Sequence, residues 1–230
     1  MISLCLTNYQ RTDLLYESYR QLINDDRITE IVISDDASSD EVYNTILWQS
    51  KAFNKVKVYR NESNLDCYRN KRQAVKLATN DWVIVGDSDN VFNTDYVDKL
   101  FSKEWEMDTL WQPSFAKPHF NFKQYEGYYI SKANVGQYMS DDTFKTMLNA
   151  MNYFVNRDEF LRVWDSSVDP VTSDSIFQNY NWLKSGNSIY VCPGLEYNHL
   201  VHEQSHYRNN VRRTPNGFHK SIEDKIKSLS

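Results

Sequence analysis

Residues 81–92 read Asp-Trp-Val-Ile-Val-Gly-Asp-Ser-Asp-Asn-Val-Phe, and the rest of the chain is organised around them. The apolar run from Trp82 to Val85 is too short for a helix and lacks polar alternation, so it predicts a strand buried on both faces. Asp87 and Asp89 follow this strand with only Ser88 between them. Because ligands of an open α/β sheet bind beyond the carboxyl ends of its strands, both carboxylates are candidate site residues.

Two carboxylates at this spacing suggest a binding site for a hard cation. They repel one another unless a cation lies between them, and oxygen ligands suit Mg²⁺ or Mn²⁺. Asp87 and Asp89 are therefore candidate metal ligands. Asp, Ser and Asn are also ordinary turn residues, so an acidic turn that binds nothing is the alternative for this tripeptide.

Composition narrows the class of protein. The chain has 230 residues, of which 40% are hydrophobic and 25% charged, and this is typical of one soluble, packed domain. No apolar run approaches a membrane span and no basic leader follows Met1, so we expect a cytoplasmic protein. The net charge of −5 argues against general nucleic-acid binding. Cys5, Cys67 and Cys192 are few and widely spaced, which predicts reduced thiols.

The first half of the chain alternates strand and helix patterns. Apolar runs predict strands at 2–6, 30–34, 56–59 and 82–85, and helical spacing predicts helices at 14–23, 42–53 and 68–79. This alternation implies right-handed crossovers and a largely parallel sheet whose loops gather at one edge.

The second half is less regular. An aromatic segment at 113–134 is expected to be a long loop, either a lid or an acceptor platform. The strand predicted at 189–192 ends before Pro193 and Gly194. The remaining predicted elements are helices at 94–105, 141–148, 157–164, 175–184 and 222–229 and extended segments at 108–112 and 151–155.

The order of the polar motifs at the strand ends is more specific than any one of them. The first strand ends in Thr-x-Tyr-x-Arg (7–11), the second in Asp-Asp-x-Ser-x-Asp (35–40) and the fourth in Asp-x-Asp (87–89). This order resembles the GT-A-fold glycosyltransferases of the family-2 type, strongly over 2–92 and weakly over 145–206. The resemblance implies an α/β fold: a single domain with a Rossmann-like, mostly parallel sheet flanked by helices.

The same resemblance implies an activity and its partners. It implies inverting transfer of a sugar from a nucleotide-sugar donor to a carbohydrate or glycoconjugate acceptor, with Mn²⁺ or Mg²⁺ as the cofactor. Residues 1–92 would form the nucleotide-sugar-binding half, 93–207 the acceptor-binding half and 208–230 a C-terminal tail with a helix. The sequence does not indicate the donor base, the sugar, the acceptor or the oligomeric state.

Individual roles follow from matching positions in that family. Asp89 resembles the direct metal ligand, and Asp87 resembles the residue that faces the ribose or the donor sugar. Lys71 lies where the family carries a basic residue near the diphosphate. The candidate donor-binding residues are Thr7, Tyr9, Arg11, Asp36, Lys71, Asp87 and Ser88, of which Thr7, Tyr9, Arg11 and Asp36 resemble the residues that hold the base and ribose.

The chain departs from the family pattern at two places. Asn64-Leu65-Asp66 and Asn70-Lys71-Arg72 replace the usual Asn-x-Gly and Ala-Arg-Asn, which leaves the diphosphate contacts open. Where the family usually has an acidic pair before the acceptor helix, this chain has Ser173-Asp174, which carries only one carboxylate. Asp174 is therefore the candidate catalytic base, and the alternative is that it caps the following helix.

Two histidines are candidates for a further metal ligand. His199 and His202 follow the last predicted strand, and an imidazole is a reasonable ligand for Mn²⁺. If the strand continued through both, they would point to opposite faces, so only one would be a ligand. We favour His202, because His-x-x-Ser before a basic segment resembles the family's metal-binding end. A surface histidine is the alternative for either one.

Two other functions compete with glycosyl transfer. A sugar-phosphate nucleotidyltransferase would carry a Gly-rich loop after the first strand, whereas this chain has Thr-Asn-Tyr-Gln-Arg without glycine. A non-catalytic nucleotide- or carbohydrate-binding module would keep the fold and lose the chemistry. The intact Asp87 and Asp89 argue against such a module, and Ser173 in place of an acid leaves it open.

Overall fold

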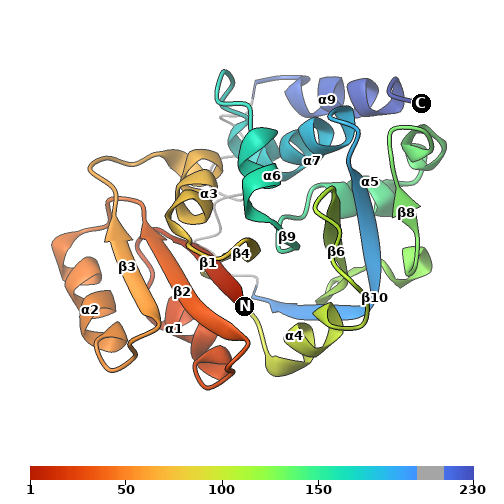
Figure 1. Ribbon diagram of the computed structural model, residues 1–230. Helices are drawn as coiled ribbons and strands as arrows, with labels where there is room; N and C mark the ends of the chain where they lie inside the picture. The colour runs from red at the N-terminus through yellow and green to blue at the C-terminus, as the bar shows by residue number, and fades with distance from the viewer. Residues whose placement is uncertain (201–214) are drawn as a thin grey trace.

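The computed structural model describes residues 1–200 and 215–230 (Figure 1). Its centre is a sheet with the strand order β3-β2-β1-β4-β9-β6-β10-β5, in which β7 pairs with β6 and β8 with β10. The first four strands in this order run parallel. They are β1 (Ile2–Asn8), β2 (Ile28–Asp35), β3 (Val56–Arg60) and β4 (Trp82–Asp87).

The second half of the chain completes the sheet. The short strand β9 is antiparallel to both β4 and β6, whereas β10 is parallel to β6 and antiparallel to β5. The last pairing brings the end of β10 beside the residues that follow β4. The bounds are β5 (Asn90–Val91), β6 (Thr109–Lys117), β7 (Phe120–Asn121), β8 (Tyr129–Ile130), β9 (Phe154–Asn156) and β10 (Ser188–His199).

Helices cover both faces of the sheet (Figure 1). One buried cluster of apolar side chains includes residues of α3 (Asp66–Leu77), α5 (Asp142–Leu148), α6 (Arg157–Arg162), α7 (Asp174–Lys184) and α9 (Phe218–Lys227). The other cluster includes residues of α1 (Asp13–Tyr19), α2 (Asp40–Ser50) and α4 (Thr94–Leu100). The 3₁₀ turns of the described residues are η1 (Arg20–Leu22), η2 (Lys123–Tyr125), η3 (Val135–Tyr138) and η4 (Val171–Ser173). The expected α/β domain with a mostly parallel sheet is confirmed.

The alternation of side chains along the central strands explains the two cores. Cys5 of β1 packs into one cluster, and its neighbours Leu4 and Leu6 pack into the other. On β4, Val83 packs into the same cluster as Cys5, and Ile84 packs into the cluster of Leu4 and Leu6. A strand that buries both faces needs an unbroken apolar run, which is the pattern that predicted these strands.

Local residues define two helix ends, and the expectation of reduced cysteines is confirmed. Ser39 caps α2, with its Oγ accepting a hydrogen bond from the backbone of Val42 at 3.4 Å. Gly186 follows α7 with a φ of +95°, a conformation that favours glycine at the end of a helix. The three cysteines are free thiols. Among the described residues, no helix has both the length and the apolar character needed to cross a membrane.

The predicted loop at 113–134 is wrong in part. β6 continues to Lys117, and β7, η2 and β8 give much of the segment regular structure. The strand predicted at 189–192 is also too short, because β10 extends to His199. A shift in the β6–β10 register between Cys192 and Glu196 lets β10 pass Pro193. Proline removes one backbone donor from the ladder, and the irregular register at this point accommodates it.

Candidate active site

The carboxyl ends of β1, β2 and β4 open onto a cleft of about 1650 Å³. The structure brings most of the predicted site residues to this cleft. Ser88 is fully buried and does not line it, and His202 lies outside the described residues. The predicted residues that line the cleft are Thr7, Tyr9, Arg11, Asp36, Lys71, Asp87, Asp89, Asp174 and His199.

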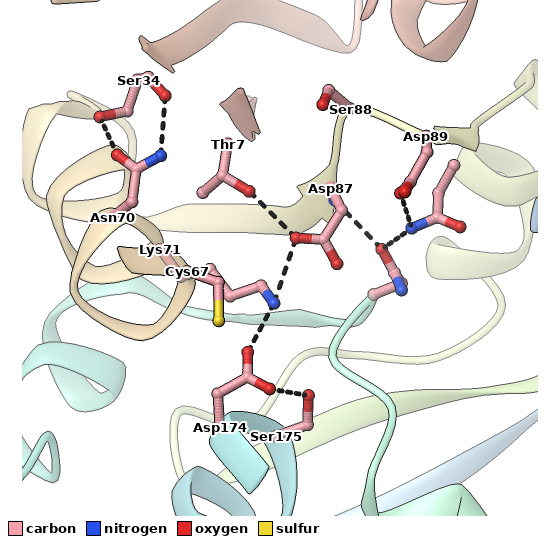
Figure 2. Close-up of polar contacts among 12 residues, drawn as sticks. Thr7, Ser34, Cys67, Asn70, Lys71, Asp87, Ser88, Asp89, Asp174 and Ser175 are labelled. Atoms are coloured by element: carbon pink, nitrogen blue, oxygen red, sulfur yellow. Dashed lines mark hydrogen bonds and ion pairs between the residues drawn. The ribbon is translucent and has the colours of Figure 1, made fainter. Parts of the chain in front are cut away.

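Lys71 joins the two sides of the cleft (Figure 2). Its Nζ lies 3.1 Å from Asp87 Oδ1 and 2.7 Å from Asp174 Oδ2. Thr7 Oγ1 donates a hydrogen bond to the same Asp87 oxygen at 3.0 Å. The carboxylate at the end of β4 and the carboxylate at the start of α7 therefore share one ammonium group.

The charge on Lys71 is stabilised by these partners. Burial alone disfavours the ammonium, but the carboxylates of Asp174 and Asp87 outweigh it and hold the pKa of Lys71 well above its usual value. Lys71 is therefore a permanent cation in the floor of the cleft. Removing it would leave two acidic side chains facing each other without this counter-charge.

Asp174 is the first residue of α7, and the cap position before it belongs to Ser173. The alternative that Asp174 caps the helix is therefore wrong. Its Oδ2 contacts Lys71, and its Oδ1 accepts a hydrogen bond from Ser175 Oγ at 3.5 Å. The carboxylate thus faces the cleft at a helix N-terminus, where the helix dipole favours negative charge.

Arg11 contacts the second carboxylate of the β4 motif. Its Nη1 lies 3.2 Å from Asp89 Oδ2 and donates a hydrogen bond to Ser88 Oγ at 3.1 Å. Both charged side chains are mostly buried, with exposures of 13% for Arg11 and 11% for Asp89. The buried Ser88 thus holds a residue that lines the cleft, although Ser88 itself does not line it.

The two acidic residues at the end of β2 have separate roles in the structure. Asp35 is fully buried and accepts hydrogen bonds from Asn8 Nδ2 at 3.0 Å and Ser38 Oγ at 2.6 Å, which hold the end of β1 and the loop after β2 against the end of β2. Asp36 turns to the cleft, where Leu65 N–H and Asn61 Nδ2 donate to its Oδ1. Burial raises the pKa of Asp36, although both hydrogen bonds favour its charged form.

Several asparagines that hold the site were not predicted from the sequence. Asn152 Oδ1 accepts a hydrogen bond from Asp87 N–H at 3.3 Å and another from Asn90 Nδ2 at 3.0 Å. Asn152 Nδ2 donates to Tyr197 Oη on β10 at 3.1 Å. Asn152 thus ties the loop after β4 to β10. It belongs to no recognisable motif, so only its contacts identify it.

His199 is held in one tautomer. Asn90 Nδ2 points to acceptors on Asn152 and Asp89, so Asn90 Oδ1 is the atom that faces His199 Nδ1 at 2.7 Å. Because an amide oxygen only accepts, Nδ1 carries the proton, and in the neutral ring Nε2 carries the lone pair that a metal requires.

The far end of the cleft includes the C-terminal helix. His219 on α9 lies with its Nδ1 3.0 Å from Ser173 Oγ, directly before Asp174. Burial lowers the pKa of His219, which favours its neutral form. Lys220 and Glu223 of the same helix also line the cleft. The sequence predicted a C-terminal tail with a helix near 222–229. In the structure this helix packs on the core through the buried side chains of Ile222 and Ile226.

The donor atoms at the end of β4 fit a hard divalent cation. Asp87 and Asp89 both line the cleft. Asp89 already contacts one cation, the guanidinium of Arg11. Within 1–200 and 215–230, no three His, Cys, Asp or Glu side chains form a group that could hold a metal. Magnesium-type sites often use one or two carboxylates and complete their shell with substrate phosphates, so two carboxylates are sufficient here.

The fold and the cleft define a protein of the GT-A glycosyltransferase class. Polar residues of the cleft lie at the ends of β1, β2 and β4 in its Rossmann-like half. Asp174 faces them from the start of α7. The model of a family described as "Glycosyl transferase family 2" matches residues 3–168. The chain belongs to this family.

Solved structures of the same fold have low sequence identity. A mannosyltransferase from Pyrobaculum calidifontis, PcManGT, in complex with GDP-Man and Mn²⁺, is 12% identical with a TM-score of 0.67, covering 99% of this chain and 69% of that one. TarS 1–349 from S. aureus is 15% identical with a TM-score of 0.62, covering 86% and 60%. The same TarS fragment in complex with UDP-GlcNAc is 14% identical with a TM-score of 0.63, covering 89% and 60%. The chain thus spans about two thirds of their lengths. A comparison with curated proteins found no significant match.

Proposed function

We propose that the protein is an inverting, metal-dependent glycosyltransferase that moves a sugar from a nucleoside-diphosphate sugar to a hydroxyl of a glycan or glycoconjugate. The observation that carries the proposal is the Asp87–Lys71–Asp174 bridge, which links a strand-end carboxylate to a helix-start carboxylate across one cleft. Family membership supports a donor of this class. The structures of PcManGT with GDP-Man and of TarS with UDP-GlcNAc support the same donor class.

The first half of the chain supplies the donor side in this proposal. Asp36 would bind the ribose or base through its carboxylate, and the half-exposed ring of Tyr9 would pack against the base. Thr7 positions Asp87 by its hydrogen bond, so its role is to orient a donor-binding residue. We keep 1–92 as the donor half and 93–207 as the acceptor half, and we add α9 to the acceptor side because His219 reaches Ser173.

Asp89 is the proposed direct ligand of Mn²⁺ or Mg²⁺, with Asp87 beside it. His199 is a candidate further ligand through Nε2, because its Nδ1 faces Asn90 Oδ1, and His202 remains a second candidate. When bound, the cation would neutralise the charge that develops on the leaving diphosphate. The protein's part is to hold these oxygens at the end of a buried strand, where Asn152 and Thr7 limit their movement.

Asp174 is the proposed general base. A carboxylate that takes the proton of an acceptor hydroxyl contributes roughly 10²–10⁴-fold in rate. Its contact with Lys71 fixes its orientation toward the donor side. One base and one displacement give inversion, and no residue of 173–175 other than Asp174 carries a carboxylate for a second displacement.

Replacing Asp89 by alanine tests the donor site. The change should abolish the gain in affinity that Mn²⁺ gives to a nucleoside diphosphate, because the direct ligand is lost, whereas Asp87→Ala should weaken both binding and turnover. Isothermal titration calorimetry with UDP and GDP, with and without Mn²⁺, measures this. The matched control is Asp158→Ala, which removes an exposed carboxylate on α6 outside the cleft. Unchanged metal-dependent affinity in the Asp89 variant would remove Asp89 from the metal site.

A further inference from the structure

Within residues 1–200 and 215–230, each carboxylate of the β4 motif contacts a different basic residue. Asp87 contacts Lys71, and Asp89 contacts Arg11. The two basic residues come from different elements, since Lys71 lies on α3 and Arg11 on the loop after β1. Among Arg11, Lys71, Asp87, Asp89 and Asp174, three carboxylates therefore meet two cations.

The two basic residues differ in the element that carries them and in their contacts within the described part of the chain. Lys71 is 5% exposed, projects from the middle of a helix and contacts two carboxylates at once. Arg11 is 13% exposed, belongs to a loop and reaches both Asp89 and Ser88 through Nη1. Of these two cations, Arg11 has the planar guanidinium that binds phosphate oxygens in a bidentate way, and it lies on a loop at the cleft.

We propose that Arg11 is an internal counter-ion that occupies the place of the divalent metal on Asp89 until a nucleoside diphosphate binds. The diphosphate then draws the guanidinium away, because phosphate oxygens are strong bidentate partners of arginine, and Asp89 becomes available to the metal. This proposal rests on the proposed function, in which Asp89 is the metal ligand. It changes the role of Arg11 from a contact of the base and ribose to a residue that controls metal entry.

The physical basis is competition for one carboxylate. A guanidinium and a divalent cation cannot both lie against Asp89 without repelling each other, and the low exposure of the pair reduces screening by solvent. Arg11 lies against Oδ2 of Asp89 and Asn90 Nδ2 donates a hydrogen bond to Oδ1 at 3.3 Å, so a metal that binds Asp89 competes with both partners, and diphosphate binding assists the displacement of Arg11. By linkage, the metal and the diphosphate must raise each other's affinity through Arg11 by the same factor.

Arginine-to-glutamine substitution separates this role from a simple contact with the nucleotide. Arg11→Gln should bind Mn²⁺ more tightly than the wild type without nucleotide, by a factor in the range of about 5 to 150 that is typical of coupled sites. The same variant should bind UDP or GDP more weakly and should lose most of the cooperativity between metal and nucleotide. The readout is the electron paramagnetic resonance signal of free Mn²⁺ during a titration, which requires no turnover.

Two further variants serve as controls. Arg162→Gln removes the same charge from an arginine–carboxylate pair on α6 outside the cleft, and it should leave Mn²⁺ binding unchanged. Ser88→Ala removes only the hydroxyl that holds Arg11, and it should raise the affinity for Mn²⁺ by a smaller factor in the same direction. If Arg11→Gln does not fold, as judged by its thermal unfolding, Ser88→Ala alone provides the test.

The outcomes distinguish failure of this inference from failure of the proposed function. Asp89→Asn should abolish Mn²⁺ binding in the presence of UDP or GDP; if it does not, the metal site itself is wrong. If Asp89→Asn does abolish it but Arg11→Gln and Ser88→Ala bind Mn²⁺ no better than the wild type without nucleotide, Arg11 is not a competing counter-ion. Tighter Mn²⁺ binding together with reduced cooperativity supports the inference.

Discussion

Lys71 connects two carboxylates that lie far apart in the sequence. Its partner Asp174 is 103 residues away, and its other partner Asp87 ends a different element. The resemblance placed Lys71 near the diphosphate, and its position on the cleft is compatible with that role. The bridge adds that the same ammonium orients the proposed base, which no local pattern could predict because the pairing depends on how α7 packs on α3.

At the residue scale, Asp174→Asn is the most informative change. Asparagine keeps the size of the side chain and an oxygen for Lys71, but it cannot take a proton. We therefore expect donor hydrolysis or transfer to fall by roughly 10²–10⁴-fold, with the affinity for a nucleoside diphosphate nearly intact. Steady-state assays and calorimetry on the same preparation measure the two quantities.

The unfolding free energy of Asp174→Asn provides the control. Removing one partner of a buried ion pair destabilises a protein when the other charge is left alone, but here Lys71 keeps Asp87. The variant should therefore remain folded at the assay temperature. If turnover equals that of the wild type while the protein is folded, Asp174 is not the base.

At the element scale, β4 and the turn after it depend on one close contact. A Cβ on Gly86 would lie 2.6 Å from Cε2 of Phe92, so the ring of Phe92 packs directly on the backbone of β4. Phe92 in turn stacks on Tyr197 of β10, with 5.9 Å between the ring centroids. This packing holds residues 87–91, with both carboxylates, between β4 and β10.

Gly86→Ala should therefore disturb the turn that carries the carboxylates. Inserting a methyl group into a filled core typically costs about 1–3 kcal/mol, and here the ring of Phe92 must move. Denaturant unfolding of Gly86→Ala, Phe92→Leu and the double variant forms a cycle that measures the contact. The smaller leucine side chain should relieve part of the strain, so the double variant should be more stable than additivity predicts. Strict additivity would show that the ring is not the obstacle.

The elements that were predicted well are those whose signal is local. β1, β2 and β4 are continuous apolar runs, and α3 has helical spacing, so each is visible within a short window. The antiparallel insertion of β9 was not predicted, because strand partners are chosen by packing across the whole chain. The extension of β10 through Pro193 was missed for the same reason, since its irregular pairing with β6 tolerates the proline.

At the scale of the whole molecule, the cleft lies where the two halves of the chain meet. The strand-end motifs of the first half were predicted to gather because parallel strands place their carboxyl ends at one edge, and the structure places Thr7, Asp36 and Asp87 there. Asn152 and His219 were missed, because a single polar residue outside a motif carries no signal in one sequence. Their positions depend on long-range contacts with Asp87 and Ser173.

The most direct test of inverting glycosyl transfer follows a nucleotide sugar by proton nuclear magnetic resonance as the protein consumes it. A panel of UDP- and GDP-linked sugars with Mn²⁺ identifies the donor, and the anomeric proton of the first product formed reports its configuration. We expect release of the nucleoside diphosphate and a product with the configuration opposite to that of the donor. Retention of configuration, or no consumption of any donor in the panel, would contradict an inverting glycosyltransferase that uses Asp174 as its base.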